Sequence, residues 1–398
     1  PEACALIQQN REKFAAYNLT LIEGKAPDAL DALPAPDAVF IGGTKGNMDA
    51  VIDAVLHKNP VARLCITAIA LETLSAAVAA LTAHGLSAEV TQIAVSRTKT
   101  AGSLHLLMAN NPVFLITGGT NMMQFLIAAP RSGSGKTTVI CAVLTALQRR
   151  GADPCAFKCG PDYIDPMFHR SALGVESHNL DLYLSAPDTV RTLYARYAAG
   201  HGAGVCEGAM GFYDGQGLTT RASAWELADT LALPVLLVVQ PKGASITLAA
   251  ELRGLLQFRT PSHIVGILLN DCSETLYKTL RPMLEAETGL TVVGYLPHLP
   301  GCAIESRHLG LKTAGEVADL QQKLGKLADA LVLDWAQLAV LTDRPAPAAP
   351  PLPTPCAPAV RVAVARDEAF CFAYAETLDA LRDAGAVSYT HLTLPTIL

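Results

Sequence analysis

The stretch FLIAAPRSGSGKTTVICAVLTALQRR, residues 125–150, decides the fold of this chain. It opens with an apolar strand, Phe125–Ala129, passes through the Ser/Gly-rich loop Arg131–Gly135, and ends in a helical pattern, Val139–Arg150. A strand, a glycine-rich loop and a helix in this order build a phosphate cradle, because the loop N–H groups and the positive helix end face the phosphates. Pro130 stands where the general pattern has its first glycine, so the match is one residue short. An ordinary Ser/Gly turn before a helix is the structural alternative.

The loop supplies most of the candidate nucleotide-binding residues. Lys136 is placed to reach the terminal phosphates, and the Thr137 hydroxyl to contact Mg²⁺. Asn270, which ends a later apolar strand, could read a purine edge, and Pro297 is a weaker candidate of the same kind. The residues expected to contact the nucleotide are Ser132, Gly133, Ser134, Gly135, Lys136, Thr137, Thr138, Asn270 and Pro297.

Acidic residues and a second lysine follow the loop. Asp162 and Asp165 lie in a Gly-Pro turn shortly after Lys158, and Glu207 ends an apolar run. Parallel α/β sheets bind ligands at the carboxyl ends of their strands, and carboxylate oxygens suit Mg²⁺. An Asx turn at Asp162 and a helix cap at Glu207 remain open as structural alternatives. The expected Mg²⁺ ligands are Thr137, Asp165 and Glu207, and the expected catalytic residues are Lys136, Lys158, Asp162, Asp165 and Glu207.

Composition narrows the class of protein. The 398 residues are 51% hydrophobic and 17% charged, which predicts two or three core-rich globular domains. The net charge of −6 makes a nucleic-acid partner improbable. Ten cysteines without a Cys-x-x-Cys pair indicate reduced thiols and a cytoplasmic location. No apolar stretch is long enough for a membrane span.

The order of apolar runs predicts α/β domains. Residues 1–120 alternate strands and helices like half of a Rossmann-like doubly wound sheet, with Glu89–Ser96 and Pro112–Thr117 expected to pair antiparallel. Residues 122–343 read as a P-loop domain with a parallel sheet, because the runs Gly204–Glu207, Pro234–Gln240 and His263–Asn270 are continuously apolar.

The remainder of the chain is predicted from its proline content and its patterning. Seven of the residues 344–358 are proline, which favours an extended polyproline linker over an ordered surface loop. Residues 359–386 begin a third unit with a strand, Val360–Ala365, and a helix, Cys371–Ala384. Residues 387–398 continue no recognisable element, and we interpret them as an artefactual tail. The first residue is Pro, and the chain looks cut at its start.

Five motifs in order make residues 122–386 resemble the cobyrinic acid a,c-diamide synthase family. They are Ala129–Thr137, Gly160–Pro166, Asn179–Asp181, Glu207–Gly215 and Ser306–Leu311. Pro130 is at home in that family, whereas Gln240 is a departure, because related enzymes often place Asp there. The resemblance implies a dethiobiotin-synthetase-like fold followed by a class I glutamine amidotransferase domain.

The implied activity is a ligase reaction of cobalamin biosynthesis. MgATP phosphorylates the a and c carboxylates of cobyrinic or hydrogenobyrinic acid, and ammonia from glutamine then displaces phosphate. The resemblance places Tyr163, Ile164, Asp181, Arg307 and His308 near this substrate. The amidotransferase cysteine and histidine are expected well beyond residue 386, because Cys371 lies too early in that domain and His391 belongs to the tail.

Residues 1–118 resemble the C-terminal part of the decarboxylating precorrin methyltransferase that acts at carbon 15. The resemblance rests on Glu23–Pro27, Pro36–Gly43, Leu71–Thr73, Ser96–Arg97 and Asn111–Phe114. That family binds S-adenosylmethionine through an early Gly-rich segment that is absent from this sequence, so we expect this part to be inactive.

Two other functions stay open at this point. One is a dethiobiotin-synthetase-like enzyme that activates a carboxylate, and the other is a MinD-like ATPase switch driven by a partner. The switch is disfavoured, because that class carries an additional lysine early in its loop, where this chain has Pro130, Arg131 and Ser132. The expected partners are a corrinoid polycarboxylate and glutamine or ammonia, with no nucleic acid or membrane, and a homodimer is compatible with the sequence.

Overall fold

The structure is a computed structural model that describes residues 2–36, 38–42, 46–59, 62–101, 104–119, 121–302, 304, 314–347, 360–364 and 372–389. The chain divides into two compact units, Pro1–Asn121 and Met122–Leu398. Across these ranges no helix combines the length and the apolar character needed to cross a membrane.

Unit 1 is built on a four-stranded sheet in the order β1-β2-β6-β3. β1 (Ala38–Ile41) runs parallel to β2 (Arg63–Ala68), and β6 (Val113–Gly119) runs antiparallel to both β2 and β3 (Ser87–Ile93). The expected antiparallel pair is therefore confirmed. The helical segments of this unit are α1 (Glu2–Lys13), the short η1 (Asp28–Leu30), α2 (Met48–Lys58) and α3 (Leu71–Ala83).

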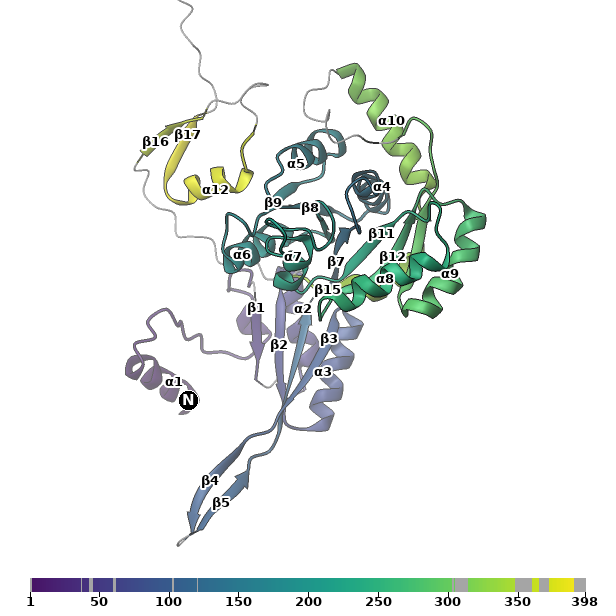
Figure 1. Ribbon diagram of the computed structural model, residues 1–398. Helices are drawn as coiled ribbons and strands as arrows, with labels where there is room; N and C mark the ends of the chain where they lie inside the picture. The colour runs from purple at the N-terminus through teal and green to yellow at the C-terminus, as the bar shows by residue number, and fades with distance from the viewer. Residues whose placement is uncertain are drawn as a thin grey trace, which may run out of the picture. The chain divides into compact units, whose positions relative to one another are not determined.

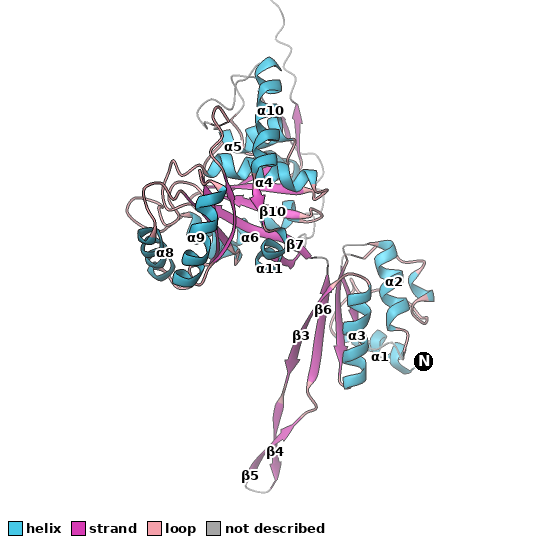
Figure 2. Cartoon of the chain, turned by 90° about the vertical axis from the view of Figure 1, so that its right-hand side faces the viewer, coloured by secondary structure: helices cyan, strands magenta, loops and turns pink. Residues whose placement is uncertain are grey.

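One apolar core holds unit 1 together. Figure 2 shows α2 and α3 on the same side of the sheet. Their inward residues, among them Ile52 and Leu81, pack with strand residues such as Ile66. All three side chains are fully buried, which is the burial that an amphipathic helix on a sheet provides.

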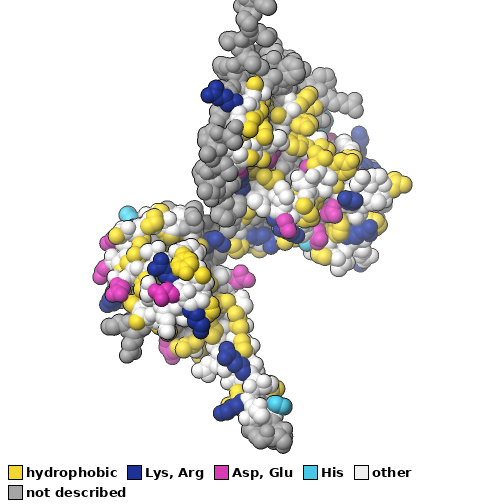
Figure 3. All heavy atoms as spheres, turned by 90° about the vertical axis from the view of Figure 1, so that its left-hand side faces the viewer, with side chains coloured by type: hydrophobic (Ala, Val, Ile, Leu, Met, Phe, Trp, Pro, Cys, Tyr) yellow, Lys and Arg dark blue, Asp and Glu magenta, His cyan; other side chains and the backbone are white. Residues whose placement is uncertain are grey.

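A hairpin of unit 1 was not predicted from the sequence. β4 (Ser96–Ala101) and β5 (Leu104–Ala109) pair antiparallel and form an arm beyond the sheet (Figures 1 and 2). Hydrophobic side chains lie beside charged ones on this arm (Figure 3), and Leu107 is 75% exposed. Strands without a buried face lack the apolar alternation from which a strand is recognised.

Unit 2 is built on a nine-stranded sheet in the order β14-β13-β12-β11-β7-β10-β8-β9, with β15 paired to β7. The neighbours from β13 to β9 are all parallel, and β14 is antiparallel to β13. The strands are β7 (Asn121–Ala128), β8 (Pro154–Cys159), β9 (Ser177–Leu180), β10 (Ala203–Glu207), β11 (Val235–Val239), β12 (Ile264–Asn270), β13 (Thr291–Leu296), β14 (Val332–Leu333) and β15 (Asp343–Pro345).

Helices cover both faces of this sheet. One face carries α6 (Pro187–Ala198), α7 (Ala224–Leu231), α8 (Ile246–Phe258) and α9 (Glu274–Thr288). The other carries α4 (Lys136–Arg149), α5 (Ile164–Phe168) with the π-helical turn η2 (His169–Leu173), α10 (Ala314–Ala330) and α11 (Trp335–Thr342). Figure 1 shows the two layers.

Central strands are apolar throughout because both of their faces are covered. Successive residues of β7 alternate between the two cores, so that Phe125 and Ile127 contact the α4 side while Leu126 and Ala128 contact the α6–α9 side. This is the burial that a parallel sheet between two helical layers requires.

The structure corrects the predictions for two segments. Arg344 and Pro345, predicted to begin a polyproline linker, lie in β15, and the Gln124 side chain donates hydrogen bonds to both of their carbonyls. Residues 387–389, predicted to continue no element, belong to β17 (Ala386–Tyr389), which pairs parallel with β16 (Val360–Ala363) around α12 (Ala375–Asp383). The predictions for residues 348–359, 365–371 and 390–398 lie outside the described residues.

Candidate functional site

The phosphate loop ends where α4 begins at Lys136, three residues before the predicted start. Gly135 precedes the helix with a left-handed φ of 80°, and no side chain caps the helix start. The N–H groups of the first turn therefore have no side-chain acceptor, and such groups at a helix N-terminus bind anions. The loop is braced from two sides: Ser134 Oγ donates to Arg131 O at 2.9 Å, and Asn270 Nδ2 donates to Ser134 O at 3.0 Å.

A pocket of about 750 Å³ opens beside this loop. Its lining includes most of the residues that the sequence singled out, contributed by β7–α4, β8, β10, β12 and β13 and the turns that follow these strands. They are Ser132, Gly133, Gly135, Lys136, Thr137, Thr138, Lys158, Asp162, Asp165, Glu207, Asn270 and Pro297.

A buried lysine joins the acids of the pocket. Lys158 Nζ lies 2.5 Å from Asp165 Oδ2, 3.2 Å from Glu207 Oε1 and 3.7 Å from Asp162 Oδ2. The strand register explains the contact with Glu207, because Lys158 of β8 and Glu207 of β10 are direct neighbours. Lys158, Asp165 and Glu207 are at most 5% exposed, so each charge depends on the others for compensation.

Glu207 also connects this cluster to the phosphate loop. Thr137 Oγ1 donates to Glu207 Oε1 at 3.0 Å, and Lys136 Nζ donates to Met210 O at 2.5 Å, just after β10. The hydroxyl, the acid and the loop lysine therefore face one space. The alternative that Glu207 caps a helix is not realised, since its carboxylate faces the side chains of Thr137, Lys158 and His169.

Burial and neighbouring charges shift the pKa values of Lys136 and Lys158 in opposite directions. Burial lowers the pKa of Lys136 below its ordinary value, with a further lowering from nearby Lys158, against the attraction of Glu207. Burial also opposes the charge on Lys158, but the attraction of Glu207, Asp165 and Asp162 outweighs it and raises the pKa of Lys158. Lys158 is therefore the firmly charged member of the pair.

Asp162 serves both the turn and the charge cluster. Its Oδ1 accepts hydrogen bonds from the backbone N–H of Ile164 at 2.9 Å and of Asp165 at 3.3 Å, while its Oδ2 faces Lys158. The Asx-turn alternative is thus realised together with the placement in the pocket. The turn holds Asp165 toward Lys158.

The other candidate residues lie elsewhere. Tyr163 stacks on Tyr374 with ring centroids 4.7 Å apart, and Ile164 packs against the core on the α4 side. Asp181 Oδ1 accepts from the N–H groups of Tyr183 and Leu184, and Asp181 does not line the pocket. Ser134 braces the loop from beneath. Arg307 and His308 lie outside the described residues.

Some pocket residues were missed from the sequence. Asp271 lines the pocket, accepts from Gln240 Nε2 at 3.0 Å and lies 3.1 Å from His298 Nδ1. Its position directly after Asn270, at the end of β12, was a usable signal. Met210 contributes a backbone carbonyl, for which residue type gives no signal.

A divalent cation is compatible with the oxygen atoms of this pocket. Asp165 Oδ1 and Glu207 Oε2 are buried and have no hydrogen-bond partner among the described residues. No three His, Cys, Asp or Glu side chains in those parts of the chain are grouped so as to hold a metal alone. Mg²⁺ is often held by one or two carboxylates together with phosphate and water, so a partial protein ligand set fits it.

Comparison with known proteins agrees with this geometry. The family model of the CobQ/CobB/MinD/ParA nucleotide binding domain matches residues 125–309. Residues 1–118 match the family model of the precorrin methyltransferase domain. The two family resemblances found in the sequence are therefore confirmed by the matching family models.

The relatives of unit 2 are named diamide synthases. The cobyrinate a,c-diamide synthase of Clostridium acetobutylicum is 40% identical over 285 residues, covering 67% of this chain and 62% of the relative. The hydrogenobyrinate a,c-diamide synthase of Brucella ovis is 39% identical over 276 residues, with coverages of 67% and 62%. The chain thus spans less than two thirds of the length of these relatives.

A solved structure is similar in sequence to unit 1. The precorrin-6y C5,15-methyltransferase of Geobacter metallireducens is 40% identical over an alignment covering 30% of this chain and 61% of that protein, with a TM-score of 0.28.

Proposed function

We propose that unit 2 uses MgATP to activate side-chain carboxylates of a corrinoid polycarboxylate for amide formation. The substrate class is that of cobyrinate or hydrogenobyrinate, named in the relatives of this unit. The observation that carries the proposal is the meeting of Thr137, Glu207 and Lys158 beside the phosphate loop. A MinD-like switch is not favoured, because the relatives at about 40% identity are named as a,c-diamide synthases.

Phosphorylation solves a chemical problem of the substrate. A carboxylate is a poor electrophile, because its negative charge repels a nucleophile and it has no good leaving group. A carboxylate oxygen attacks the γ-phosphorus, and ADP departs. Ammonia then attacks the acyl carbon, phosphate departs with the bonding electrons, and the nitrogen releases a proton. Both steps depend chiefly on positioning and charge neutralisation.

The residues divide this work between them. The N–H groups of the loop and of the first turn of α4 bind the phosphates, and Lys136 neutralises the terminal ones. Lys158 holds Asp165 and Glu207 and offers positive charge where the carboxylate approaches. Asp162 shapes the turn that presents Asp165. Asn270 keeps Ser134 in place at the nucleotide side.

Mg²⁺ would be held by Thr137, Asp165 and Glu207 together with phosphate oxygens. The ion would neutralise charge on the transferred phosphoryl group. The unpartnered Asp165 Oδ1 supports this assignment, because a buried carboxylate oxygen without a donor favours a cation, and Glu207 Oε1 lies beside the Thr137 hydroxyl.

The domain boundaries and the remaining assignments belong to the same proposal. Residues 1–120 belong to a methyltransferase domain of the S-adenosylmethionine-dependent class, and residues 122–343 form the synthetase domain. Residues 359–386 belong to a glutamine amidotransferase domain, so glutamine is the proposed ammonia source. Tyr163, Ile164 and Asp181 are proposed to act on the corrinoid side; Tyr163 contacts Phe372 and Tyr374, and Tyr374 also contacts Asp181.

The test is ATP turnover by the purified chain. ADP release is measured with Mg²⁺, with and without cobyrinic acid and ammonium chloride, and amide products are identified by mass spectrometry. We expect ADP release to require both additions. Glu207→Gln should remove turnover, while Glu287→Gln, an exposed acid on α9, serves as a matched control. ADP release that ignored the corrinoid would contradict the proposal.

A further inference from the structure

The two oxygens of the Glu207 carboxylate have different surroundings. Oε1 accepts from Thr137 at 3.0 Å and faces Lys158 at 3.2 Å. Oε2 is buried and has no hydrogen-bond partner among the described residues. Glu207 is 0% exposed, so water from the surface does not reach Oε2 freely.

A buried histidine faces the second oxygen. His169 is also 0% exposed, and its Nε2 lies 3.9 Å from Glu207 Oε2. This Nε2 is itself without a partner in the described part of the chain. His169 stands in the π-helical turn after α5, so the segment that presents Asp165 also presents His169. Single π-turns within helices are frequent at functional sites.

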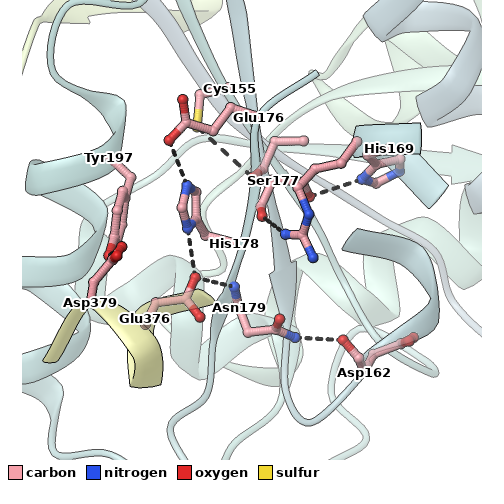
Figure 4. A network of polar contacts seen from close by, with 12 residues as sticks. Cys155, Asp162, His169, Glu176, Ser177, His178, Asn179, Tyr197, Glu376 and Asp379 are labelled. Atoms are coloured by element: carbon pink, nitrogen blue, oxygen red, sulfur yellow. Dashed lines mark hydrogen bonds and ion pairs between the residues drawn. The ribbon is translucent and has the colours of Figure 1, made fainter. Parts of the chain in front are cut away.

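Ser177 orients the imidazole from the other side. Ser177 Oγ lies 3.2 Å from His169 Nδ1, as the dashed contact in Figure 4 shows. A carboxylate can only accept, so the ring is satisfied when Nε2 carries the proton and Nδ1 accepts from the Ser177 hydroxyl. Ser177 lies on β9, where its carbonyl accepts from the Arg170 guanidinium, so the hydroxyl is held on a fixed strand.

We propose that His169, oriented by Ser177, is a positioning residue for Glu207. Its Nε2–H faces Oε2 and restrains the rotation of the carboxylate, which keeps Oε1 beside Thr137. The 3.9 Å separation is longer than a hydrogen bond, so the N–H acts on Oε2 through electrostatic attraction, which is strong in a buried site. The inference rests on the proposed function, because it needs Glu207 at the Mg²⁺ and phosphate site.

The consequence is a specific defect when the N–H is lost. With nothing facing Oε2, the carboxylate can turn about its terminal bond, and Oε1 leaves Thr137. Groups behind a metal ligand typically change metal affinity or activity by about 10–100-fold when they are removed. The defect should therefore appear in the Mg²⁺ dependence and in kcat, and much less in the binding of metal-free nucleotide.

The experiment compares His169→Phe with His169→Gln in the full chain. Phenylalanine keeps a planar ring without an N–H, and glutamine keeps an N–H near the position of Nε2. Half-saturating Mg²⁺ and kcat for ATP turnover are measured with cobyrinic acid and ammonium. Binding of a fluorescent ATP analogue in EDTA reports the nucleotide pocket separately.

We expect His169→Phe to raise half-saturating Mg²⁺ about tenfold and to lower kcat about tenfold, with metal-free nucleotide affinity nearly unchanged. His169→Gln should stay within about threefold of the parent chain. If both variants are equally impaired, or if His169→Phe behaves like the parent, the positioning role is overturned.

A second pair covers the case in which His169→Phe does not fold. Ser177→Ala should shift the Mg²⁺ dependence in the same direction, while Ser177→Thr keeps the hydroxyl and restores it. Equal behaviour of these two variants overturns the inference. A parent chain that binds no nucleotide and turns over no ATP refutes the proposed function itself, whereas an active parent with unaffected variants refutes only the role of His169.

Discussion

Gly135→Ala tests the phosphate loop most directly, because two separate physical effects meet at this residue. Gly135 has φ +80°, in the left-handed region that favours glycine. A Cβ added there would lie 2.1 Å from Asn270 Nδ2, which currently donates to Ser134 O. The substitution therefore strains the backbone and also displaces a buried amide.

The magnitude follows from these two effects. A left-handed alanine costs about 1–2 kcal/mol, and the reduced freedom of the unfolded chain offsets about 0.4–1 kcal/mol of that. Displacing Asn270, which is 4% exposed, leaves a buried donor unsatisfied at about 1–3 kcal/mol. We expect the free energy of unfolding of unit 2 to fall by about 3 kcal/mol. Nucleotide affinity should fall as well, because the loop N–H groups move.

Gly133→Ala is the matched control. Gly133 has φ +78°, but an added Cβ meets nothing within 4 Å, so only the backbone strain applies. Urea unfolding should show a loss of about 1 kcal/mol or less for this variant. In an Asn270→Ala background the clash at Gly135 disappears, so Gly135→Ala should then cost no more than Gly133→Ala. Equal costs for the two glycines in the parent chain would refute the reasoning.

The other predictions concern chemistry, pH and domain independence. Lys136→Ala should abolish ATP turnover, since the loop amine is lost; undiminished ADP release would remove the loop from the mechanism. Burial lowers the pKa of His169 to about 4. Between pH 6.5 and 4 the unfolded chain therefore binds a proton that the folded chain does not, and stability falls with falling pH, by about 3 kcal/mol near pH 4. In urea unfolding, the stability of His169→Gln should depend less on pH over this window than that of the parent chain. Identical slopes would contradict the lowered pKa of His169. Ile52→Ala, at a fully buried position in unit 1, should destabilise that unit by about 2–5 kcal/mol without changing nucleotide affinity; a coupled loss of affinity would contradict independent units.

Local patterns were enough to predict the elements of the phosphate site. The apolar run into Ala129, the Ser/Gly loop and the following helix are short-range features, and the structure has β7, the loop and α4 at these positions. The acids at strand ends were found by the same logic, because a parallel sheet brings the carboxyl ends of its strands to one edge. Asp271 was not predicted, although it directly follows Asn270 at the end of β12.

Local sequence patterns do not predict the register in which strands pair. Lys158 lies opposite Glu207 because β8 and β10 pair in one particular register, and a shift of one residue would turn Lys158 to the other face. The contact between His169 and Glu207 likewise depends on how the turn after α5 packs on the sheet. The residues next to His169 and Glu207 in the sequence do not predict this contact.

The sequence by itself determined the α/β class, the phosphate loop and the set of acids around it, because strand, loop and helix signals act over a few residues. Only the tertiary structure decided which atoms meet. Glu207 divides its oxygens between Thr137 and Lys158 on one side and His169 on the other, and β15 pairs with β7 across more than two hundred residues. Such contacts form between segments distant in the chain, where pairing and packing in three dimensions, rather than local preference, determine the free energy.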